Sequence, residues 1–247
     1  MIAVPGQAKS SEWQAQWTLF EDDERFLFDE WIRPFTIAGF RGQSVLELGC
    51  GGGQHTCYVA EVAQSVTAVD LNTVDIARER TRRFGNVELV EADIMSLDLG
   101  RTFETLYRHC RPGGTLIVWT YSAEGNALVR HVVEPIRKHV LRYLPRRILY
   151  SISTVLTAAL YPAVHTVYRL EALRFLPYFE YFRNFRRLRF DRNRLNVFDK
   201  LNAPQTRFTT AETCRRWLDP SRFDPASLSI RRYAGVSYSL VARRREG

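Results

Sequence analysis

The stretch Ser44-Val-Leu-Glu-Leu48, followed directly by Gly49-Cys-Gly-Gly-Gly53, decides the fold of this chain. A short aliphatic run that ends in glycine indicates a buried strand leading into a tight turn. Glycines at such a turn let the backbone approach a ligand where a side chain would collide. The sequence therefore predicts a ligand-binding loop between this strand and a helix over residues 54–63.

The chain then continues in a regular alternation of strands and helices. A strand over 65–69 ends at Asp70, a helix capped by Asn72 runs to residue 84, and a strand over 87–90 closes at Ala92-Asp93. Strands that alternate with helices at this spacing indicate right-handed parallel crossovers. We expect an α/β fold, a doubly wound Rossmann-like and mostly parallel sheet.

The remaining segments complete the expected domain organisation. A helix over 20–37 precedes the first strand, and a helix over 102–111 leads through Pro112-Gly-Gly114 into a strand over 115–119. Two runs over 227–233 and 236–242 indicate an antiparallel C-terminal hairpin. The predicted parts are an N-terminal helical cap (1–39), a Rossmann-like core (40–123), a helical lid insertion rich in aromatic and basic residues (124–201) and the C-terminal part of the core sheet (202–247).

Two acids follow the loop at positions that indicate an adenosyl ligand. Asp70 comes 21 residues after Gly49, where a carboxylate accepts hydrogen bonds from both ribose hydroxyls, and Asp93 can reach an adenine amino group. A dinucleotide fingerprint requires a third glycine where this chain has Gln54. Glu47, inside the strand, would repel a pyrophosphate and suits a ligand with a positive amino group and sulfonium.

These motifs together resemble one family. The runs Val45-Leu-Glu-Leu-Gly-Cys-Gly-Gly-Gly53, Val69-Asp-Leu71, Glu91-Ala-Asp93 and Arg111-Pro-Gly-Gly114 resemble those of the class I S-adenosylmethionine-dependent methyltransferases. The resemblance covers about residues 40–120 and implies that Gly49, Gly51 and the nearby backbone hold the methionine part of S-adenosylmethionine. The cofactor-binding residues that we predict are Glu47, Gly49, Cys50, Gly51, Gly53, Gln54, Asp70, Leu71, Ala92, Asp93 and Ile94.

The chain departs from the family after Asp93. Only 21 residues separate Asp93 from Thr115, too few for the helix, fourth strand and further helix that the family has there. The fourth strand region is therefore expected to be missing, so that the strand at Thr115 pairs with the first strand or the first strand keeps an unpaired edge. A catalytically impaired, non-enzymatic remnant that acts as an interaction or membrane-surface protein is a second hypothesis for this reason.

The lid suggests the substrate class. Its dense aromatic residues predict a small, apolar or aromatic metabolite as the methyl acceptor, because such a lid excludes water from methyl transfer. The aromatic residues are Tyr161, Tyr168, Phe175, Tyr178, Phe179, Tyr181, Phe182, Phe185 and Phe190. Six interleaved arginines between 183 and 194 leave an RNA methyltransferase as a third hypothesis, although the helical spacing of the aromatics favours a core over a nucleic-acid surface.

No catalytic residue can be named from the sequence, and no metal site is predicted. His55 is interpreted as a helix-start residue and His109 as structural or exposed. The other candidates, none of them selected by its surroundings, are Tyr121, His131, His139, His165 and Glu180.

Composition and charge limit the partners. The 247 residues are 45% hydrophobic and 25% charged, which is typical of a globular protein. Lysine and arginine number 35 against 27 acids, and the excess lies after residue 101. A basic half can attract nucleic acid, an anionic membrane or an acidic substrate, but a solvated basic face is the favoured interpretation.

Three further features bear on location. The four cysteines lack C-x-x-C spacing, which fits a reducing cytoplasm, and residues 1–14 do not resemble a signal peptide. Residues 148–168 carry no charge, and this length approaches that of a membrane span. Because Pro162 and several polar residues interrupt the segment, a buried or lid-forming helix pair broken at Pro162 is favoured over a span or a peripheral membrane contact.

Overall fold

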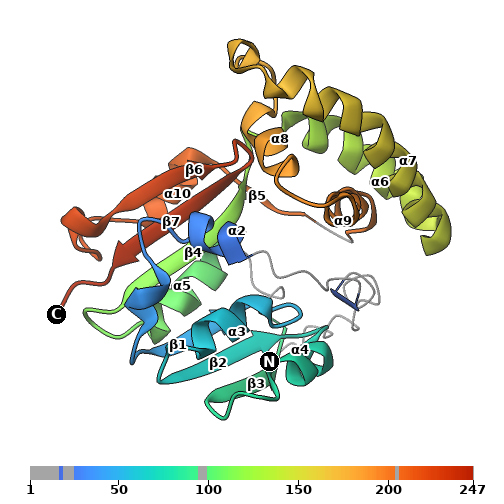
Figure 1. Cartoon of the computed structure of the whole chain (residues 1–247). Coiled ribbons are helices and arrows are strands. Elements are labelled where there is room, and N and C mark those ends of the chain that lie inside the picture. The colour runs from blue at the N-terminus through green and yellow to red at the C-terminus, as the bar shows by residue number, and fades with distance from the viewer. Residues whose placement is uncertain (1–16, 19–24, 94–98, 204–205, 247) are drawn as a thin grey trace. The chain divides into compact units, whose positions relative to one another are not determined.

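The computed structural model describes residues 17–18, 25–93, 99–203 and 206–246 (Figure 1). The chain divides into two compact units. Unit 1 takes its described residues from 1–118, 215–229 and 240–247, and unit 2 consists of residues 119–214 and 230–239. Ile94, one of the predicted cofactor-binding residues, lies outside the described residues.

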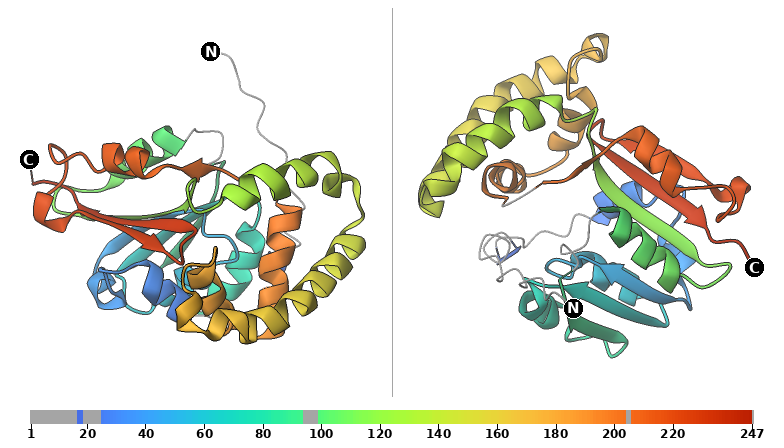
Figure 2. Two further views of the ribbon diagram at one scale, coloured as in Figure 1. Left: turned by 90° about the horizontal axis from the view of Figure 1, so that it is seen from above. Right: turned by 180° about the vertical axis from the view of Figure 1, so that it is seen from behind.

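Sheet A of unit 1 holds three parallel strands in the order β1 (Ser44–Leu48), β2 (Ser65–Asp70) and β3 (Val87–Glu91). The crossover helices are α3 (Gln54–Ala60), which packs against β2, and α4 (Val74–Thr81), which packs against β3 (Figures 1 and 2). The three strands confirm the predicted alternation. Both helices end about three residues earlier than expected.

The core of unit 1 forms where the central strand meets the helices. Val66 and Ala68 of β2 are buried, as the interior strand of a parallel sheet requires. α2 (Arg25–Trp31) adds Phe28 to the same cluster, and the 3₁₀ helix η1 (Ile37–Phe40) follows it. The opening helix therefore ends at Trp31, six residues before the predicted end, while residues 20–24 lie outside the described part.

The expected shortening after β3 is present in the described chain. Between β3 and β4 (Thr115–Ser122) the described residues form the helix α5 (Leu99–His109) and no strand. β4 does not join β1; it belongs to a separate four-stranded sheet, sheet B, with the order β5-β4-β7-β6. Among the described residues β1 thus keeps an unpaired edge, the second of the two expected outcomes, and their strands form two sheets instead of one.

Sheet B combines parallel and antiparallel neighbours. β5 (Phe208–Thr209) pairs in parallel with β4, and the sequence did not predict it or the helix α10 (Ala211–Trp217) that follows. β7 (Ser237–Arg243) runs antiparallel to β4, because backbone bonds join Gly114 to Arg244 at one end and Ser122 to Val236 at the other. β6 (Ser229–Tyr233), preceded by the 3₁₀ helix η6 (Pro225–Ser227), forms the predicted C-terminal hairpin with β7.

The hairpin turn places a non-glycine residue in a strained conformation. Ala234 and Gly235 both have positive φ, 49° and 72°, and the Val236 N–H donates to the Tyr233 carbonyl at 3.2 Å. These are the features of a type I′ turn, which favours Asn-Gly.

We therefore expect Ala234→Asn to stabilise the protein by about 0.5 kcal/mol, because asparagine tolerates the left-handed region better than alanine. Chemical denaturation of the intact chain measures the change in the free energy of unfolding. Gly235→Ala is the matched control and should destabilise by a comparable or larger amount; a stabilising Gly235→Ala would contradict the turn assignment.

Unit 2 is helical between β4 and β5. The π-helical segment η2 (Val129–Val133) leads into α6 (Glu134–His139), and α7 (Arg146–His165) packs against α9 (Phe190–Asn202). α8 (Phe179–Phe185) lies between them in the sequence, and the remaining short 3₁₀ segments are η3 (Leu141–Tyr143), η4 (Val167–Arg169) and η5 (Glu171–Leu173).

α7 corrects two expectations. It is one continuous helix of 20 residues that contains Pro162, not a pair of helices broken there. Pro162 lies one turn from the helix end, where the Thr166 N–H and hydroxyl both donate to its carbonyl. The missing proline N–H removes the one helical bond that it would make to the carbonyl of Ala158. α7 is also mostly unburied, and it is the helix of the described chain that is long and apolar enough to cross a membrane by length and composition alone.

The aromatic side chains of α8 pack on one another. Phe179 and Phe185 are buried, and Tyr181, Phe182 and Tyr168 make ring contacts within this cluster at centroid distances of 4.6–6.2 Å. This arrangement agrees with the helical spacing in the sequence, which favoured a core.

Candidate functional site

The glycine loop begins at the carboxyl end of β1. Gly49, Gly51 and Gly53 all have positive φ, and Gly53 is the N-cap of α3. The N–H groups of Gly49 and Cys50 donate to the Val69 carbonyl at 2.7 and 3.1 Å. The loop is thus fixed to β2 on the side where Asp70 ends that strand.

Asp70 is joined directly to the loop. Its Oδ2 accepts a hydrogen bond from the Gly51 N–H at 3.1 Å, and its Oδ1 accepts one from the Asn72 N–H at 2.8 Å. The Thr73 hydroxyl donates to the Gly51 carbonyl at 2.6 Å. Asp70 remains partly exposed, so its carboxylate oxygens keep lone pairs for further donors.

Thr73 also corrects a sequence prediction. It, not Asn72, is the N-cap of α4, although its side chain makes no capping bond. The Asn72 backbone turns toward Asp70 instead, and the Thr73 hydroxyl is occupied by Gly51. The helix start is therefore used to hold the loop.

Glu47 is a buried carboxyl group in β1. The Thr56 hydroxyl donates to its Oε2 at 2.7 Å. Burial raises the pKa of Glu47 from its ordinary 4.5 to about 7, the Thr56 hydrogen bond lowers it, and the nearby charge of Asp70 raises it further. A carboxyl group in this setting gains most when a cation arrives, because a positive charge offsets the cost of burying the ionised form.

Gly51 lies against an aromatic side chain that no local sequence pattern predicts at this position. A Cβ built on Gly51 would meet the indole of Trp17 at 2.4 Å, so the ring packs directly on the glycine backbone. The absence of a side chain at Gly51 is thus required for this contact and for its φ of 56°.

The other predicted cofactor residues fall into three groups. Cys50 is buried, and burial raises the pKa of its thiol, which disfavours the reactive thiolate form. Gln54 starts α3 and Leu71 follows β2, both partly exposed. Ala92 is brought beside Asp70 by a bond from its N–H to the Asp70 carbonyl at 3.1 Å, which places Asp93 one residue beyond that point.

Sequence reasoning missed four residues around the loop. These are Trp17, Thr56, Thr73 and Arg80, whose guanidinium donates to the Gly52 carbonyl at 2.6 Å. Thr56 lies in the first turn of α3, and Thr73 directly precedes α4. A hydroxyl residue at a helix start next to the glycine loop or Asp70 is a pattern that the sequence could have shown. Trp17 and Arg80 come from elements whose proximity no local pattern encodes.

His55 has a structural role. Its ring packs against the rings of Phe28 and Trp31, with centroid distances of 4.8 and 5.9 Å, and this agrees with its interpretation as a helix-start residue. The contact with α2 stabilises the start of α3 and with it the loop.

Unit 2 contains a separate buried polar cluster. The Lys200 ammonium donates to the Tyr181 hydroxyl at 2.9 Å, and Arg137, itself buried, donates to the Thr206 hydroxyl at 3.1 Å. Burial raises the pKa of Tyr121, at the end of β4, so this hydroxyl stays protonated. The pKa of Lys200 is also raised: burial opposes the charge, but the hydrogen bond to Tyr181 and the charge of Asp199 outweigh it.

Comparison with known proteins bears on unit 1 above all. Residues 45–107 match the family model of the methyltransferase domain, a range that runs from β1 into α5 and contains the loop and Asp70. The chain is 28% identical over 160 residues to a demethylmenaquinone methyltransferase of Tropheryma whipplei (strain Twist), which covers 55% of this chain and 64% of that protein.

Two other relatives share shorter regions. A mitochondrial ubiquinone biosynthesis O-methyltransferase of Schizosaccharomyces pombe is 26% identical over 131 residues, covering 43% of this chain and 47% of that protein. A ribosomal RNA small subunit methyltransferase A of Alkaliphilus oremlandii is 33% identical over 86 residues, covering 33% and 30%. The matches thus span less than two thirds of these relatives' own lengths, and what the three names have in common is methyl transfer.

Proposed function

We propose that this chain, which belongs to the class I S-adenosylmethionine-dependent methyltransferases, binds S-adenosylmethionine at the glycine loop and methylates a small, apolar or aromatic acceptor. The observation that carries the proposal is the joining of the glycine loop to Asp70, beside the buried carboxyl group of Glu47.

The donor set fits this cofactor. Glu47 is a buried carboxyl group with a raised pKa, and S-adenosylmethionine carries two positive groups, an ammonium and a sulfonium. Asp70 keeps acceptor capacity for two ribose hydroxyls. Ala92 and Asp93 follow β3 next to Asp70, where an adenine would extend from the ribose.

The residues of the chain contribute by positioning. When bound, S-adenosylmethionine supplies an electrophilic methyl group; the acceptor–carbon bond forms as the carbon–sulfur bond breaks, which leaves S-adenosylhomocysteine. Asp70 would fix the adenosyl part and Glu47 would favour the cationic ground state, so the loop provides orientation more than acid–base chemistry. No base is assigned.

Two observations support a small acceptor over RNA. The names of two relatives refer to quinone compounds, which are small and apolar. In the aromatic and basic segment, Arg183 is paired with Glu180 and Arg194 with Asp191, so these arginines are occupied by local acids. A segment that binds RNA by stacking would instead leave such arginines to the phosphates.

Methyl transfer from labelled S-adenosylmethionine tests the proposal. We expect label to enter phenols or quinols with apolar tails and not RNA. Label in RNA alone would favour the RNA hypothesis. If neither calorimetry nor a thermal shift detects binding of the cofactor, the non-enzymatic hypothesis would be favoured. The non-enzymatic hypothesis is included in the test because β1 lies at an edge of sheet A among the described strands.

Trp17 offers a direct report on ligand binding. Because its indole covers Gly51, a ligand on the loop must contact or displace the ring. We expect titration with S-adenosylhomocysteine to change the tryptophan emission of the native chain, and Trp17→Phe to lose most of that change. Trp217→Phe is the matched control, since Trp217 stacks on Phe103 within unit 1, and should keep the change. An equal response in Trp17→Phe would mean that the ligand binds away from the loop.

The four cysteines are all free, in agreement with a cytoplasmic location, which we also propose.

A further inference from the structure

α7 has an inverted pattern of side chains. Its inner face toward α9 carries Ser153 and Thr157, both fully buried, with Leu149 and Val164. Its outer face carries Ile148, Ile152, Val155 and Leu156, at helical spacing, and Val155 is 68% exposed. A helix that packs only against its own protein is expected to bury its large aliphatic side chains and expose its small polar ones.

The polar side chains on the inner face of α7 make their hydrogen bonds within the helix. The Ser153 hydroxyl donates to the Leu149 carbonyl and the Thr157 hydroxyl to the Ser153 carbonyl, both at 2.7 Å. Small residues with satisfied hydroxyls allow close packing on α9. The inversion is therefore a stable arrangement, and the outer face is the part of α7 that lacks a covering element in the described chain.

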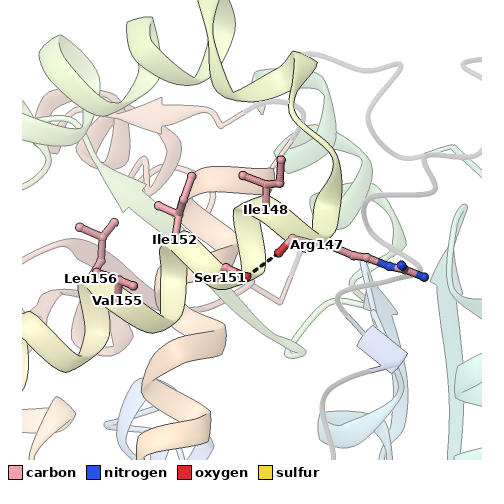
Figure 3. A pocket seen from close by; sticks show the side chains of 6 residues that line it. All are labelled: Arg147, Ile148, Ser151, Ile152, Val155 and Leu156. Carbon is pink, nitrogen blue, oxygen red and sulfur yellow. Dashed lines mark hydrogen bonds between the residues drawn. The ribbon is translucent and has the colours of Figure 1, made fainter.

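The outer face forms a shallow apolar hollow. Figure 3 shows Ile148, Ile152 and Leu156 pointing to the same side of α7, with Arg147 at its end. The hollow has a volume of about 420 Å³ and is lined by Arg147, Ile148, Ser151, Ile152, Val155 and Leu156. The Ser151 hydroxyl donates to the Arg147 carbonyl, so this donor is already satisfied within the helix.

A second exposed stripe precedes α7. Leu128, Val132, Ile136 and Val140 recur every four residues through η2 and α6, and all four are exposed, as is Tyr143 at 71%. Unit 2 thus presents two consecutive helices with exposed aliphatic side chains. Exposed large aliphatic side chains in this number mark an interaction site on a folded protein.

Bases outnumber acids around these helices, although Glu134 at the start of α6 pairs with Lys138 at 3.1 Å. Residues 135–170 contain six lysines and arginines and no aspartate or glutamate. Of these bases, Lys138, Arg142, Arg146, Arg147 and Arg169 are exposed, and they lie before, between and after the apolar stretches. Apolar side chains bordered by bases are the signature of a helix that lies on an anionic bilayer.

We propose that the outer faces of α6 and α7 form a docking surface for an anionic lipid bilayer. The surface is peripheral and not spanning, because the inner face of α7 is held by α9 and offers lipid one side only. A second copy of the chain fits less well as the occupant, since two surfaces on which bases outnumber acids would repel each other. The proposal does not depend on methyl transfer.

Flotation with vesicles of phosphatidylcholine, with and without phosphatidylserine, tests the proposal on the full chain without cofactor. We expect binding to the anionic vesicles that declines as salt is added. Val155→Asp should weaken binding roughly ten-fold, because it places a carboxylate at the centre of the apolar face. The control Ile230→Asp introduces the same charge at an exposed apolar position on β6 and should bind nearly as the native chain does.

Charge reversal tests the electrostatic part separately. Arg147→Glu is expected to lower binding roughly ten-fold or more. Arg215→Glu, an exposed arginine on α10, makes the same change in net charge and should have little effect. Circular dichroism and melting temperature establish that each variant is folded.

Three results would overturn the proposal. One is the absence of binding to anionic vesicles by the folded native chain. Another is a native dimer, seen by light scattering, that Val155→Asp dissociates while vesicle binding is unchanged, since the face would then join two copies. The third is retention on the vesicles after high salt and alkaline carbonate, which would indicate a helix that crosses the bilayer.

Discussion

Asp70→Asn is expected to lower the affinity for S-adenosylmethionine about 100-fold, because two charge-assisted hydrogen bonds to the ribose are weakened together. The substitution keeps an oxygen for the Asn72 N–H, which Asp70 accepts at 2.8 Å, so the turn into α4 retains one of its contacts. Isothermal titration calorimetry measures the affinity, and a melting curve shows whether the variant is folded.

Asp75→Asn is the matched control for this substitution. Asp75 lies in the first turn of α4, is exposed and pairs only locally with Arg78 at 2.7 Å. It should bind the cofactor as the native chain does. Equal heats from the native protein and from folded Asp70→Asn would remove Asp70 from the site and with it the main support for the adenosyl ligand.

Glu47→Gln is expected to stabilise the cofactor-free protein at about pH 8 by up to about 3 kcal/mol. The folded-state pKa of Glu47, about 7, lies above the ordinary value of 4.5, so between these values the folded state binds more protons than the unfolded state. Native stability therefore falls as the pH rises from about 4.5 to about 7, and the glutamine variant lacks this loss.

The same substitution should have the opposite effect on the ligand. A cationic ligand favours ionised Glu47, so the native affinity should rise with pH up to about 7 and binding should release protons below that value. Glu47→Gln should bind more weakly and show neither trend. Calorimetry in buffers of different ionisation enthalpy measures the protons released.

Glu88→Gln provides the control for both effects. Glu88 lies on the neighbouring strand β3, is exposed and accepts from the Thr67 hydroxyl at 3.5 Å. It should change neither the stability profile nor the affinity. If Glu47→Gln has no stabilising effect at about pH 8, then ionised Glu47 does not destabilise the folded protein. The expected preference of the site for a cationic ligand would then fail as well.

The first strands of the fold and the loop could be predicted because their signals are local. The run of Val45, Leu46 and Leu48 ends where Gly49 begins, and β1 has these bounds. Asp70 closes β2 as expected because parallel crossovers bring strand ends to the same edge. That the described residues between β3 and β4 form no strand was also predictable, since 21 residues set a limit that no packing can change.

The helices were less well predicted. Proline disfavours a helix interior on average, but Pro162 is tolerated one turn before the end of α7. Thr73 replaces Asn72 as the N-cap, because the Asn72 N–H is bound by Asp70 two residues earlier. The bond from the Thr73 hydroxyl to the Gly51 carbonyl is the contact there that depends on tertiary structure. β5, with two residues, is too short for any periodic signal.

The sequence by itself determined the parallel strands, the glycine loop, the acids that follow it and their resemblance to one family, because spacing along the chain fixes these features. Only the tertiary structure decided that Thr56 meets a buried Glu47, that Trp17 covers Gly51, that β4 leaves β1 for a second sheet and that α7 turns its aliphatic side chains outward. Each of these depends on burial and on partners distant in sequence, and a periodic pattern reports which side chains share a face but not which face is covered.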